Sequence, residues 1–483
     1  MQTKTKVLIG TVLVCLVSAS GFLGKNLPRA RAMASEWEQV GSTGAKAGGT
    51  DFVTLKFKSL TGEPYLALSD EDNGEKATVI KYSGSSWEAV GARGFSVGKA
   101  SYTNLAFNPS TDEPYVIYSD DSSNYLTPVK KFNGSNWEEI SGSSALTAYW
   151  LPGVEFNPGT NELYAIYPDA MDSNRVRVVK HNGSGWENVG ATGLSSGTSN
   201  RVYLAFNPLT YEAYAAFLDN DVNYDVVVKK FNGGSWETLG NTGLAPGLTM
   251  VDFAFAVNPV TGEHYVEVAP ESAGYKLTVK KWNGSSWEVV GGENFSPPAV
   301  MPCLGFNPAT NDLYIAYSGS DYSWRPTLMK YRGGISWEQI GLYTGGASTY
   351  NSLAFNPLTS EPYIAYVDDA AADEIKVIKF DRGVDTDTPI LNYNISKKAK
   401  KNIVLTFDDL AGARKEGMKV RLGGKSVKVR SVRNSGNNLR VVIDAKYYKW
   451  ARGYYGLTMS YKKKTGKKWV KNSFSATGVL RVQ

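Results

Sequence analysis

Acidic side chains on alternate residues of two loops are the first candidates for chemistry. The segment "LDNDVNYD" places Asp219, Asp221 and Asn223 at every second position, and "SDEDNGE" does the same with Asp70 and Asp72. Hard cations such as calcium prefer oxygen ligands of this kind. The distant Glu of an EF-hand loop is missing, so the alternative is a solvated acidic loop. We therefore expect no cofactor unless calcium binds at Asp219, Asp221 and Asn223.

Histidine, cysteine and arginine are too few to indicate a catalytic site. The chain has two histidines, His181 and His264, and two cysteines, of which Cys15 lies in an N-terminal apolar run. A zinc site or a Ser-His-Asp triad needs more of these groups than the sequence offers. A sialidase-type hydrolase needs arginines around a substrate carboxylate. Residues 35–383 hold seven arginines, and only Arg201 immediately precedes the apolar strand of a repeat. We predict no catalytic residue.

A recurring tryptophan defines an internal repeat. Seven Trp residues are separated by 50, 50, 49, 50, 51 and 50 residues: Trp37, Trp87, Trp137, Trp186, Trp236, Trp287 and Trp337. Each repeat contains an inner strand ending in "FNP" or a variant, a strand centred on Tyr, a strand like "VVVKKF", and the Trp strand. Short β-branched and aromatic runs between Asn-Pro, Thr-Gly and Asn-Gly turns are typical of hairpins. The sequence therefore predicts an all-β fold with a seven-bladed β-propeller over residues 35–383.

The two ends of the repeat array complement each other. The array begins with a surplus Trp strand, Glu36 to Gly41, and its last unit stops after Glu374 to Phe380 without one. An open array would leave exposed strand edges, which proteins tend to avoid. We expect the N-terminal strand to complete the seventh blade and close the ring.

The loops that vary between repeats indicate a binding face. In a four-stranded blade, the loops from the fourth to the first strand and from the second to the third lie on the same side, and the former vary most here. Aromatic faces and acidic acceptors on this rim suit a carbohydrate or a protein segment. The candidate ligand-binding residues are Tyr102, Trp150, Arg201, Tyr203, Asp252, Tyr350, Asp120, Asp169 and Asp368. The alternative is that the aromatic residues plug the central channel.

The repeat also resembles a known group of proteins. Units of "NGSSWE-x-VG" followed by "LAFNP-x-T-x-E-P-Y" look like those of secreted bacterial seven-bladed propellers with sialidase-type or lectin-like repeats, from Trp37 to about Phe380. The Asp of the sialidase Asp-box is absent from "NGSSW". The resemblance implies the propeller architecture and leaves the activity open.

The C-terminal part has a different composition. Residues 384–390 read as a linker, and residues 391–483 contain short alternating strands that predict a β-sandwich. The segments "VRLGGKSVKVRSV" and "YYGLTMSY" resemble immunoglobulin-like domains of the TIG type, which implies a spacer or adhesion module. Residues 35–383 carry 24 Lys and Arg against 40 Asp and Glu, whereas residues 384–483 carry 23 against 6.

The basic surplus of the C-terminal part predicts an anionic partner. The candidate residues are Lys462, Lys463, Lys464, Lys467 and Lys468. We expect them to attach to a membrane surface or an acidic envelope polymer. The alternative is that the basic domain docks on the acidic propeller. Nucleic acid is not an expected partner, and we expect a monomer.

The N-terminus predicts export. Residues 1–34 contain lysines, an apolar run from Val7 to Val17 and small residues before Ser35, as in a signal peptide or an N-terminal anchor. We therefore expect a secreted or cell-surface protein. Two functions are open: a non-catalytic binding or adhesion protein, or a propeller glycoside hydrolase or lyase that acts on extracellular polysaccharide.

Overall fold

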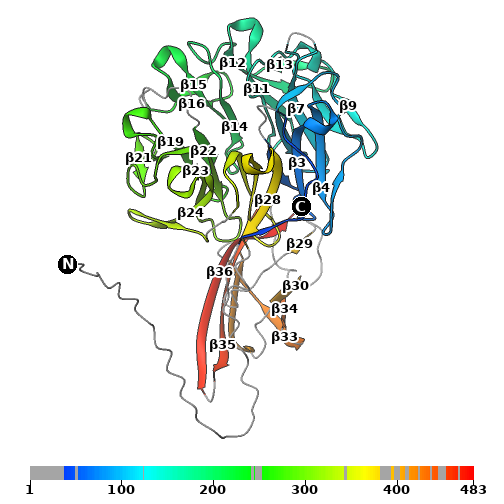
Figure 1. Ribbon diagram of the computed structural model, residues 1–483. Coiled ribbons are helices and arrows are strands. Elements are labelled where there is room, and N and C mark those ends of the chain that lie inside the picture. The colour runs from blue at the N-terminus through cyan, green and yellow to red at the C-terminus, as the bar shows by residue number, and fades with distance from the viewer. Residues whose placement is uncertain are drawn as a thin grey trace, which may run out of the picture. The chain divides into compact units, whose positions relative to one another are not determined.

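The structure, a computed structural model, describes residues 37–48, 53–122, 125–240, 244, 253–341 and 345–380, together with eight strands between Tyr393 and Val482. Residues 37–380 form seven four-stranded antiparallel sheets, which are the blades of a β-propeller (Figure 1). In the figure the colours follow the ring from blue through green to yellow. The predicted all-β, seven-bladed fold is confirmed.

Within each blade, the strands follow the chain from the channel outwards. Blade 1 consists of β2 (Thr54–Phe57), β3 (Pro64–Asp70), β4 (Lys76–Tyr82) and β5 (Trp87–Ala89). Blade 2 consists of β6 (Ala100–Phe107), β7 (Pro114–Asp120), β8 (Val129–Phe132) and β9 (Trp137–Glu139). Blade 3 consists of β10 (Gly153–Phe156), β11 (Leu163–Asp169), β12 (Arg175–His181) and β13 (Trp186–Asn188). Blade 4 consists of β14 (Val202–Phe206), β15 (Ala213–Asp219), β16 (Asp225–Phe231) and β17 (Trp236–Thr238).

Blades 5 and 6 repeat this order, and in blade 7 the outermost strand is β1, from the N-terminal end of the array. Blade 5 consists of β18 (Ala254–Val257), β19 (His264–Val268), β20 (Thr278–Trp282) and β21 (Trp287–Val290). Blade 6 consists of β22 (Ala299–Phe306), β23 (Leu313–Gly319), β24 (Arg325–Gly333) and β25 (Ser336–Gln339). Blade 7 consists of β26 (Ser348–Phe355), β27 (Pro362–Asp368), β28 (Glu374–Phe380) and β1 (Trp37–Gln39).

Short 3-10 turns join the second and third strands in six blades. They are η1 (Glu71–Asn73), η3 (Ala170–Asp172), η4 (Asn220–Val222), η5 (Glu271–Ala273), η6 (Ser320–Tyr322) and η7 (Asp369–Ala371). A further one, η2 (Ser143–Ala145), lies in the loop between blades 2 and 3. No helix within the described residues is long and apolar enough to cross a membrane.

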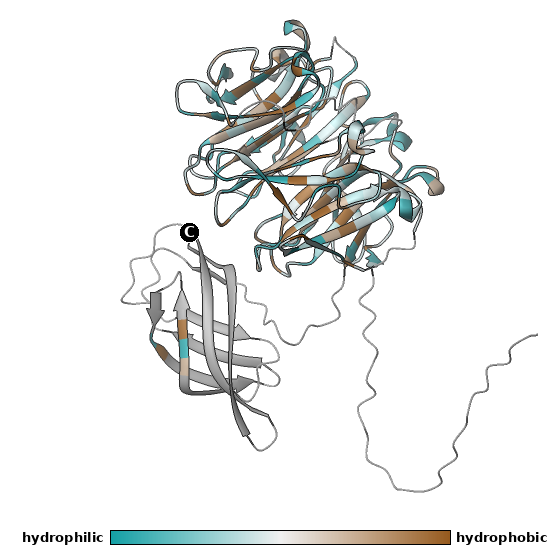
Figure 2. Cartoon of the chain, turned by 90° about the vertical axis from the view of Figure 1, so that its left-hand side faces the viewer, coloured by the Kyte–Doolittle hydropathy of each residue, from teal (hydrophilic) through white to brown (hydrophobic). Residues whose placement is uncertain are grey.

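The repeat produces one hydrophobic cluster at each blade interface. Every residue of β3 is buried, because the second strand is covered by a neighbouring blade on both faces. Trp87 packs in the cluster between blades 7 and 1, whereas Val90, three residues later, packs in the cluster between blades 1 and 2. Figure 2 shows apolar residues, in brown, along the strands of the propeller. The Trp and the aliphatic residue three positions later therefore face opposite neighbouring blades.

The Trp indole also ties five of the seven blades to the one before each of them. Trp87 Nε1 donates to the carbonyl of Val40 at 2.6 Å, and Trp137 Nε1 donates to that of Val90 at 2.7 Å. In each case the acceptor carbonyl belongs to the residue three positions after the Trp of the preceding repeat. Trp186 Nε1 and Trp337 Nε1 are buried without a hydrogen-bond partner. A repeated Trp therefore supplies both apolar area and an interblade hydrogen bond.

The ring is closed by the N-terminal strand, as predicted. Strand β1 pairs antiparallel with β28, and Trp37 lies opposite Phe380. Trp37 Nε1 donates to the carbonyl of Ile340 at 3.0 Å, so the closing blade keeps the interblade bond of the repeat. The seventh blade is therefore built from both ends of the array.

The C-terminal strands form two further sheets. One has the order β29 (Tyr393–Ile395), β36 (Lys468–Val482), β35 (Gly453–Thr465), β31 (Ala413–Leu422) and β32 (Lys425–Val427). The other has the order β30 (Ile403–Phe407), β34 (Asn438–Ile443) and β33 (Val429–Ser435). The immunoglobulin-like identity of this part and the linker at 384–390 stay predictions. The predicted signal segment, residues 1–34, lies outside the described residues.

Candidate functional site

The loops expected to bind a ligand lie on one face of the propeller. The loops between blades make β-bridges with the ends of second strands or the starts of third strands, as in Ala47 with Asp70 and Ala148 with Asp169. We call this side the loop face. The Asn-Pro and Asn-Gly turns lie on the opposite side, the turn face, because the strands of each blade alternate in direction. The strand order assumed in predicting the binding face is therefore correct.

Four aromatic rings form a continuous row on the loop face, between blades 2 and 3. The ring centroids of Tyr125 and Tyr149 are 4.3 Å apart, those of Tyr149 and Trp150 are 4.8 Å apart, and those of Trp150 and Tyr102 are 6.1 Å apart. Tyr125 and Tyr149 are 41% and 40% exposed, while Trp150 and Tyr102 are half-buried. We call these four residues the aromatic array. It joins two residues predicted for the site, Tyr102 and Trp150.

Backbone contacts hold the array in place. Ala148, directly before Tyr149, is fully buried, and its N–H donates to Thr127 Oγ1 at 2.7 Å and to the carbonyl of Tyr125 at 3.1 Å. The Ser119 hydroxyl donates to the carbonyl of Ala148 at 2.7 Å. These bonds fix the loop of Tyr149 against the turn of Tyr125, so the array is largely preorganised.

Arg201 and Tyr203 lie together at the start of the inner strand of blade 4. Tyr203 donates its hydroxyl to the carbonyl of Phe253 in blade 5 at 2.9 Å. Burial raises the pKa of Tyr203 to about 12, and burial lowers the pKa of Arg201, which also hydrogen-bonds to Tyr203. Arg201 is within electrostatic range of Tyr102 in blade 2 and Cys303 in blade 6. Arg201 therefore lies near inner-strand residues of blades 2 and 6.

The predicted rim carboxylates are buried and used by the chain itself. Asp120 accepts hydrogen bonds from the N–H groups of Val97 and Gly98 at 3.2 and 3.0 Å. Asp169 accepts from the hydroxyl of Thr147 at 2.8 Å. The predicted members of this set are 2 to 3% exposed: Asp120, Asp169 and Asp368. Their observed role is to position the loops, so we leave them out of the ligand-contacting set.

The remaining predicted residues divide into described and undescribed ones. Tyr350 lies at a β-bulge of β26 with a φ of 55°, equivalent to Tyr102 of β6 with 56°, and packs against the cluster between blades 7 and 1. Asp252 and Lys467 lie outside the described residues.

The backbones of Lys462, Lys463, Lys464 and Lys468 lie in the β35–β36 hairpin, where Lys462 pairs with Lys471. The anionic-surface role of these lysines stays a prediction.

The calcium prediction gains no geometric support. Asp219 is 3% exposed, and its carboxylate accepts from the N–H groups of Ser196 and Gly197 at 2.8 and 2.9 Å. Asn223 caps η4 in a left-handed conformation. Among the described residues, no three His, Cys, Asp or Glu side chains are placed to hold a metal ion together. Asp219 and Asn223 shape the turn that follows β15.

A buried carboxyl group near the channel was not predicted. Glu267, in the second strand of blade 5, is fully buried, and neither carboxyl oxygen has a hydrogen-bond partner. Burial raises the pKa of Glu267 well above its usual range. Most other blades have Ala at this position, as at Ala67 and Ala316. In the sequence, the charged residue within the apolar strand "HYVEV" could have indicated this buried carboxyl group. The sequence reasoning also missed Tyr125, because its contact with Tyr149 depends on the fold.

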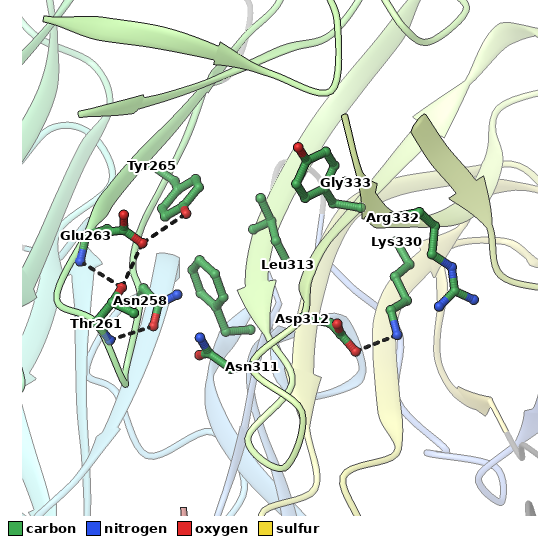
Figure 3. Close-up of a pocket in the computed structure, with 12 residues that line it drawn as sticks. Asn258, Thr261, Glu263, Tyr265, Asn311, Asp312, Leu313, Lys330, Arg332 and Gly333 are labelled. Atoms are coloured by element: carbon green, nitrogen blue, oxygen red, sulfur yellow. Dashed lines mark hydrogen bonds and ion pairs between the residues drawn. The ribbon is translucent and has the colours of Figure 1, made fainter. Parts of the chain in front are cut away.

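A groove of about 480 Å³ lies between blades 5 and 6 at the turn face (Figure 3). One wall holds Glu263, which accepts from the hydroxyl of Tyr265 at 3.4 Å, and the other holds the ion pair of Asp312 with Lys330. Arg332, at the rim, pairs with Glu338. Each charged side chain named here has a partner within the protein, so the groove is secondary to the array as a site.

The comparisons with known proteins establish the fold. No family model and no curated protein match the chain. The BP39L lectin from Burkholderia pseudomallei is 14% identical, with a TM-score of 0.52 over 68% of this chain and 95% of the lectin. The SapL1 lectin in complex with alpha methyl fucoside is 13% identical, with a TM-score of 0.44 over 61% of this chain and 96% of the lectin. At 14% identity, the match to BP39L shows a similar fold and nothing beyond the fold.

Proposed function

We propose that the propeller binds carbohydrate without catalysis, at the aromatic array of Tyr102, Tyr125, Tyr149 and Trp150. The observation that carries this proposal is the unbroken row of four rings with two Tyr side chains exposed on the loop face. Aromatic side chains offer an apolar face to the apolar side of a sugar ring, and their polar atoms can hydrogen-bond to hydroxyl groups. The BP39L neighbour is described as a lectin, which agrees with this interpretation.

The rigidity of the array favours binding over an unspecific role in packing. Tyr125 and Tyr149 keep 41% and 40% of their surface exposed, so apolar area stays open to a ligand. The bonds of Ala148 to Thr127 and Tyr125 keep the array ordered before a ligand arrives, which lowers the entropy cost of binding. The two predicted rim acids next to the array, Asp120 and Asp169, are buried and hydrogen-bonded within the chain, which disfavours a catalytic role for them.

A glycan-array screen of the protein tests this function. Tyr149→Ala and Trp150→Ala should weaken binding to any glycan hit by at least about tenfold, since stacking on aromatic residues dominates such contacts. Tyr211→Ala is a matched control, because Tyr211 is 45% exposed on the turn face. Melting curves show whether each variant is folded. Unchanged binding by folded Tyr149→Ala and Trp150→Ala would refute the proposal.

The same proposal gives the whole chain an adhesive role outside the cytoplasm. The signal-like N-terminus supports export, and the lysines of the C-terminal part support attachment to anionic polymer or lipid. Screening shortens electrostatic reach from about 10 Å at 0.1 M salt to about 3 Å at 1 M. The full chain should therefore be retained on anionic vesicles at low salt and released at high salt. Retention that persists when Lys462, Lys463, Lys464, Lys467 and Lys468 are changed to Gln would contradict this role.

A further inference from the structure

One position of the repeat has a left-handed backbone in every blade, and it is the residue just after the turn from the second to the third strand. Its φ angles lie between 54° and 60°. The seven residues are Glu75, Tyr125, Asn174, Tyr224, Tyr275, Trp324 and Asp373. None is glycine, although this conformation is one that glycine adopts freely.

The fold requires this backbone conformation whatever the side chain is. Trp324 donates its N–H to the carbonyl of Gly319 at 2.9 Å and accepts from the N–H of Ser348 at 2.7 Å. Glu75 makes the equivalent bonds, to Asp70 and from Ala100, at 2.8 Å each. The residue thus joins its own turn to the inner strand of the next blade. An aromatic side chain adds nothing to these backbone bonds.

The aromatic residues at this position are unfavourable for the fold. Asn and Asp tolerate the left-handed region, whereas bulky side chains there are outliers. Asn174 and Asp373 show that tolerant residues fit. Tyr125, Tyr224 and Trp324 are nevertheless 41%, 41% and 42% exposed, so each strained residue keeps a large part of its ring open to solvent. Strained residues of this kind concentrate at functional sites.

We propose that Tyr224, Tyr275 and Trp324 are additional carbohydrate-binding positions, one each on blades 4, 5 and 6 of the loop face. Their equivalent on blade 2, Tyr125, belongs to the aromatic array. This proposal rests on the proposed function and specifies its ligand class: a polysaccharide with repeating units that contacts several blades at once. Each ring alone is a weak site, and linkage through one polymer raises the overall affinity without new contacts.

The test compares a long ligand with a short one. Wild-type protein is screened by affinity electrophoresis in gels containing laminarin, galactomannan, xylan or alginate. Fragments of up to four sugars from each polymer that binds are then titrated by calorimetry. The variant combines Tyr224→Asn, Tyr275→Asn and Trp324→Asn, which copies Asn174 at the same position. The control combines Glu75→Asn and Asp373→Asn.

The triple variant should lose at least about tenfold in polysaccharide affinity, as expected when several linked contacts are removed. Its affinity for the short fragment, held by the array, should change less than about twofold. Its melting temperature should equal or exceed that of wild-type protein, because Asn relieves the strain. The control should bind both ligands like wild-type protein.

The possible failures are distinguishable. Wild-type protein that binds none of the polymers or fragments, and no glycan on the array, would refute the proposed function itself. A triple variant that binds polysaccharide like wild-type protein would leave the array as the carbohydrate site and overturn the additional positions. A triple variant that melts at a lower temperature would show that the three rings pack the fold, which also overturns the inference.

Discussion

Two positions of the repeat have a left-handed backbone in all seven blades, one on the turn face and one on the loop face. On the turn face the residues are Gly62, Asp112, Asn161, Tyr211, Gly262, Asn311 and Ser360. On the loop face they are Glu75, Tyr125, Asn174, Tyr224, Tyr275, Trp324 and Asp373. The turn face uses small or tolerant side chains with one exception, whereas the loop face uses four aromatic ones. On the turn face, the left-handed position carries side chains that favour stability. On the loop face, aromatic side chains at the left-handed position add backbone strain.

The turn face also carries a network that links the blades. Asn307 accepts from the N–H groups of Ala309 and Thr310 and donates from Nδ2 to the carbonyl of Ser360 in the next blade at 2.8 Å. Equivalent donations occur from Asn157, Asn207 and Asn356. We therefore assign the framework to the turn face and ligand recognition to the loop face. The following predictions test that division, from the largest expected effect to the smallest.

Trp37→Ala should have the largest effect, because it opens the ring. Trp37 packs on Phe380 with ring centroids 5.4 Å apart and bonds to Ile340, and loss of a large core aromatic costs about 3 to 5 kcal/mol. Urea unfolding measures the change, and carbohydrate binding should fall only with the folded fraction. A variant that melts like wild-type protein would show that closure does not stabilise the propeller.

His264, at the turn-face end of β19, should make stability depend on pH. Its ring lies 3.9 Å from that of Tyr214, and burial, followed by the charge of Lys230, lowers its pKa to about 4. Between this value and the unfolded pKa of about 6.5, only the unfolded chain binds the proton. Stability should therefore fall as the pH drops from about 6.5 to 4, by up to about 3 kcal/mol.

His264→Leu isolates this contribution, since Leu163 and Leu313 occupy the same position in other blades. The variant should lose less stability than wild-type protein between pH 7 and pH 4 in urea titrations. Carboxylates contribute equally to both proteins, so the difference reports His264. Parallel pH curves for the two proteins would show that the histidine is not buried in its neutral form.

The sequence predicted the framework better than the site because the two depend on different information. Trp spacing, Asn-Pro turns and the unmatched ends at Glu36 to Gly41 and Glu374 to Phe380 are periodic, and each repeat confirms the others. The sequence therefore predicted both the seven blades and the closure of the ring by β1. The C-terminal part lacks such redundancy, so its sandwich type rests on strand pattern alone.

The site was predicted only in part because its chemistry depends on contacts between repeats. Tyr102 and Trp150 come together as expected. Tyr125 joins them from the loop between the second and third strands of blade 2, through its contact with Tyr149. Asp120 and Asp169 looked like ligand acceptors because sequence does not show which N–H groups need an acceptor. The left-handed conformation at Tyr224 and Trp324 has no sequence signal when neither Gly nor Asn marks it.

Asn307→Ala should have an intermediate effect and separate the two faces. The side chain is 1% exposed and makes three hydrogen bonds, so its loss should cost about 2 to 3 kcal/mol. Binding of a glycan hit should be unchanged, because Asn307 lies on the turn face. Ser184→Ala, at an exposed turn on the same face, controls for the position. A variant of full stability with weakened binding would reverse the assignment of the faces.

Asp112→Gly should have the smallest effect. It tests whether Asp112 replaces the turn Asn that blade 1 lacks. Blade 1 has Lys58 where most blades have the turn Asn, and Asp112 of blade 2 instead accepts from the N–H groups of Ser59 and Leu60 at 3.1 and 3.3 Å. Glycine avoids new backbone strain, as at Gly62, so the cost should be that of the lost bonds, about 1 to 2 kcal/mol.

Lys58→Asn should restore most of the stability that the Asp112→Gly protein loses. The Asn side-chain oxygen can then accept hydrogen bonds from the turn N–H groups of blade 1, as Asn307 does in blade 6. A double-mutant cycle in urea should therefore give a coupling of at least about 1 kcal/mol, with glycan binding constant throughout. Additive effects would contradict the view that Asp112 replaces the missing Asn. A change in glycan affinity in either single variant would show that the turn face contributes to recognition as well as to the framework.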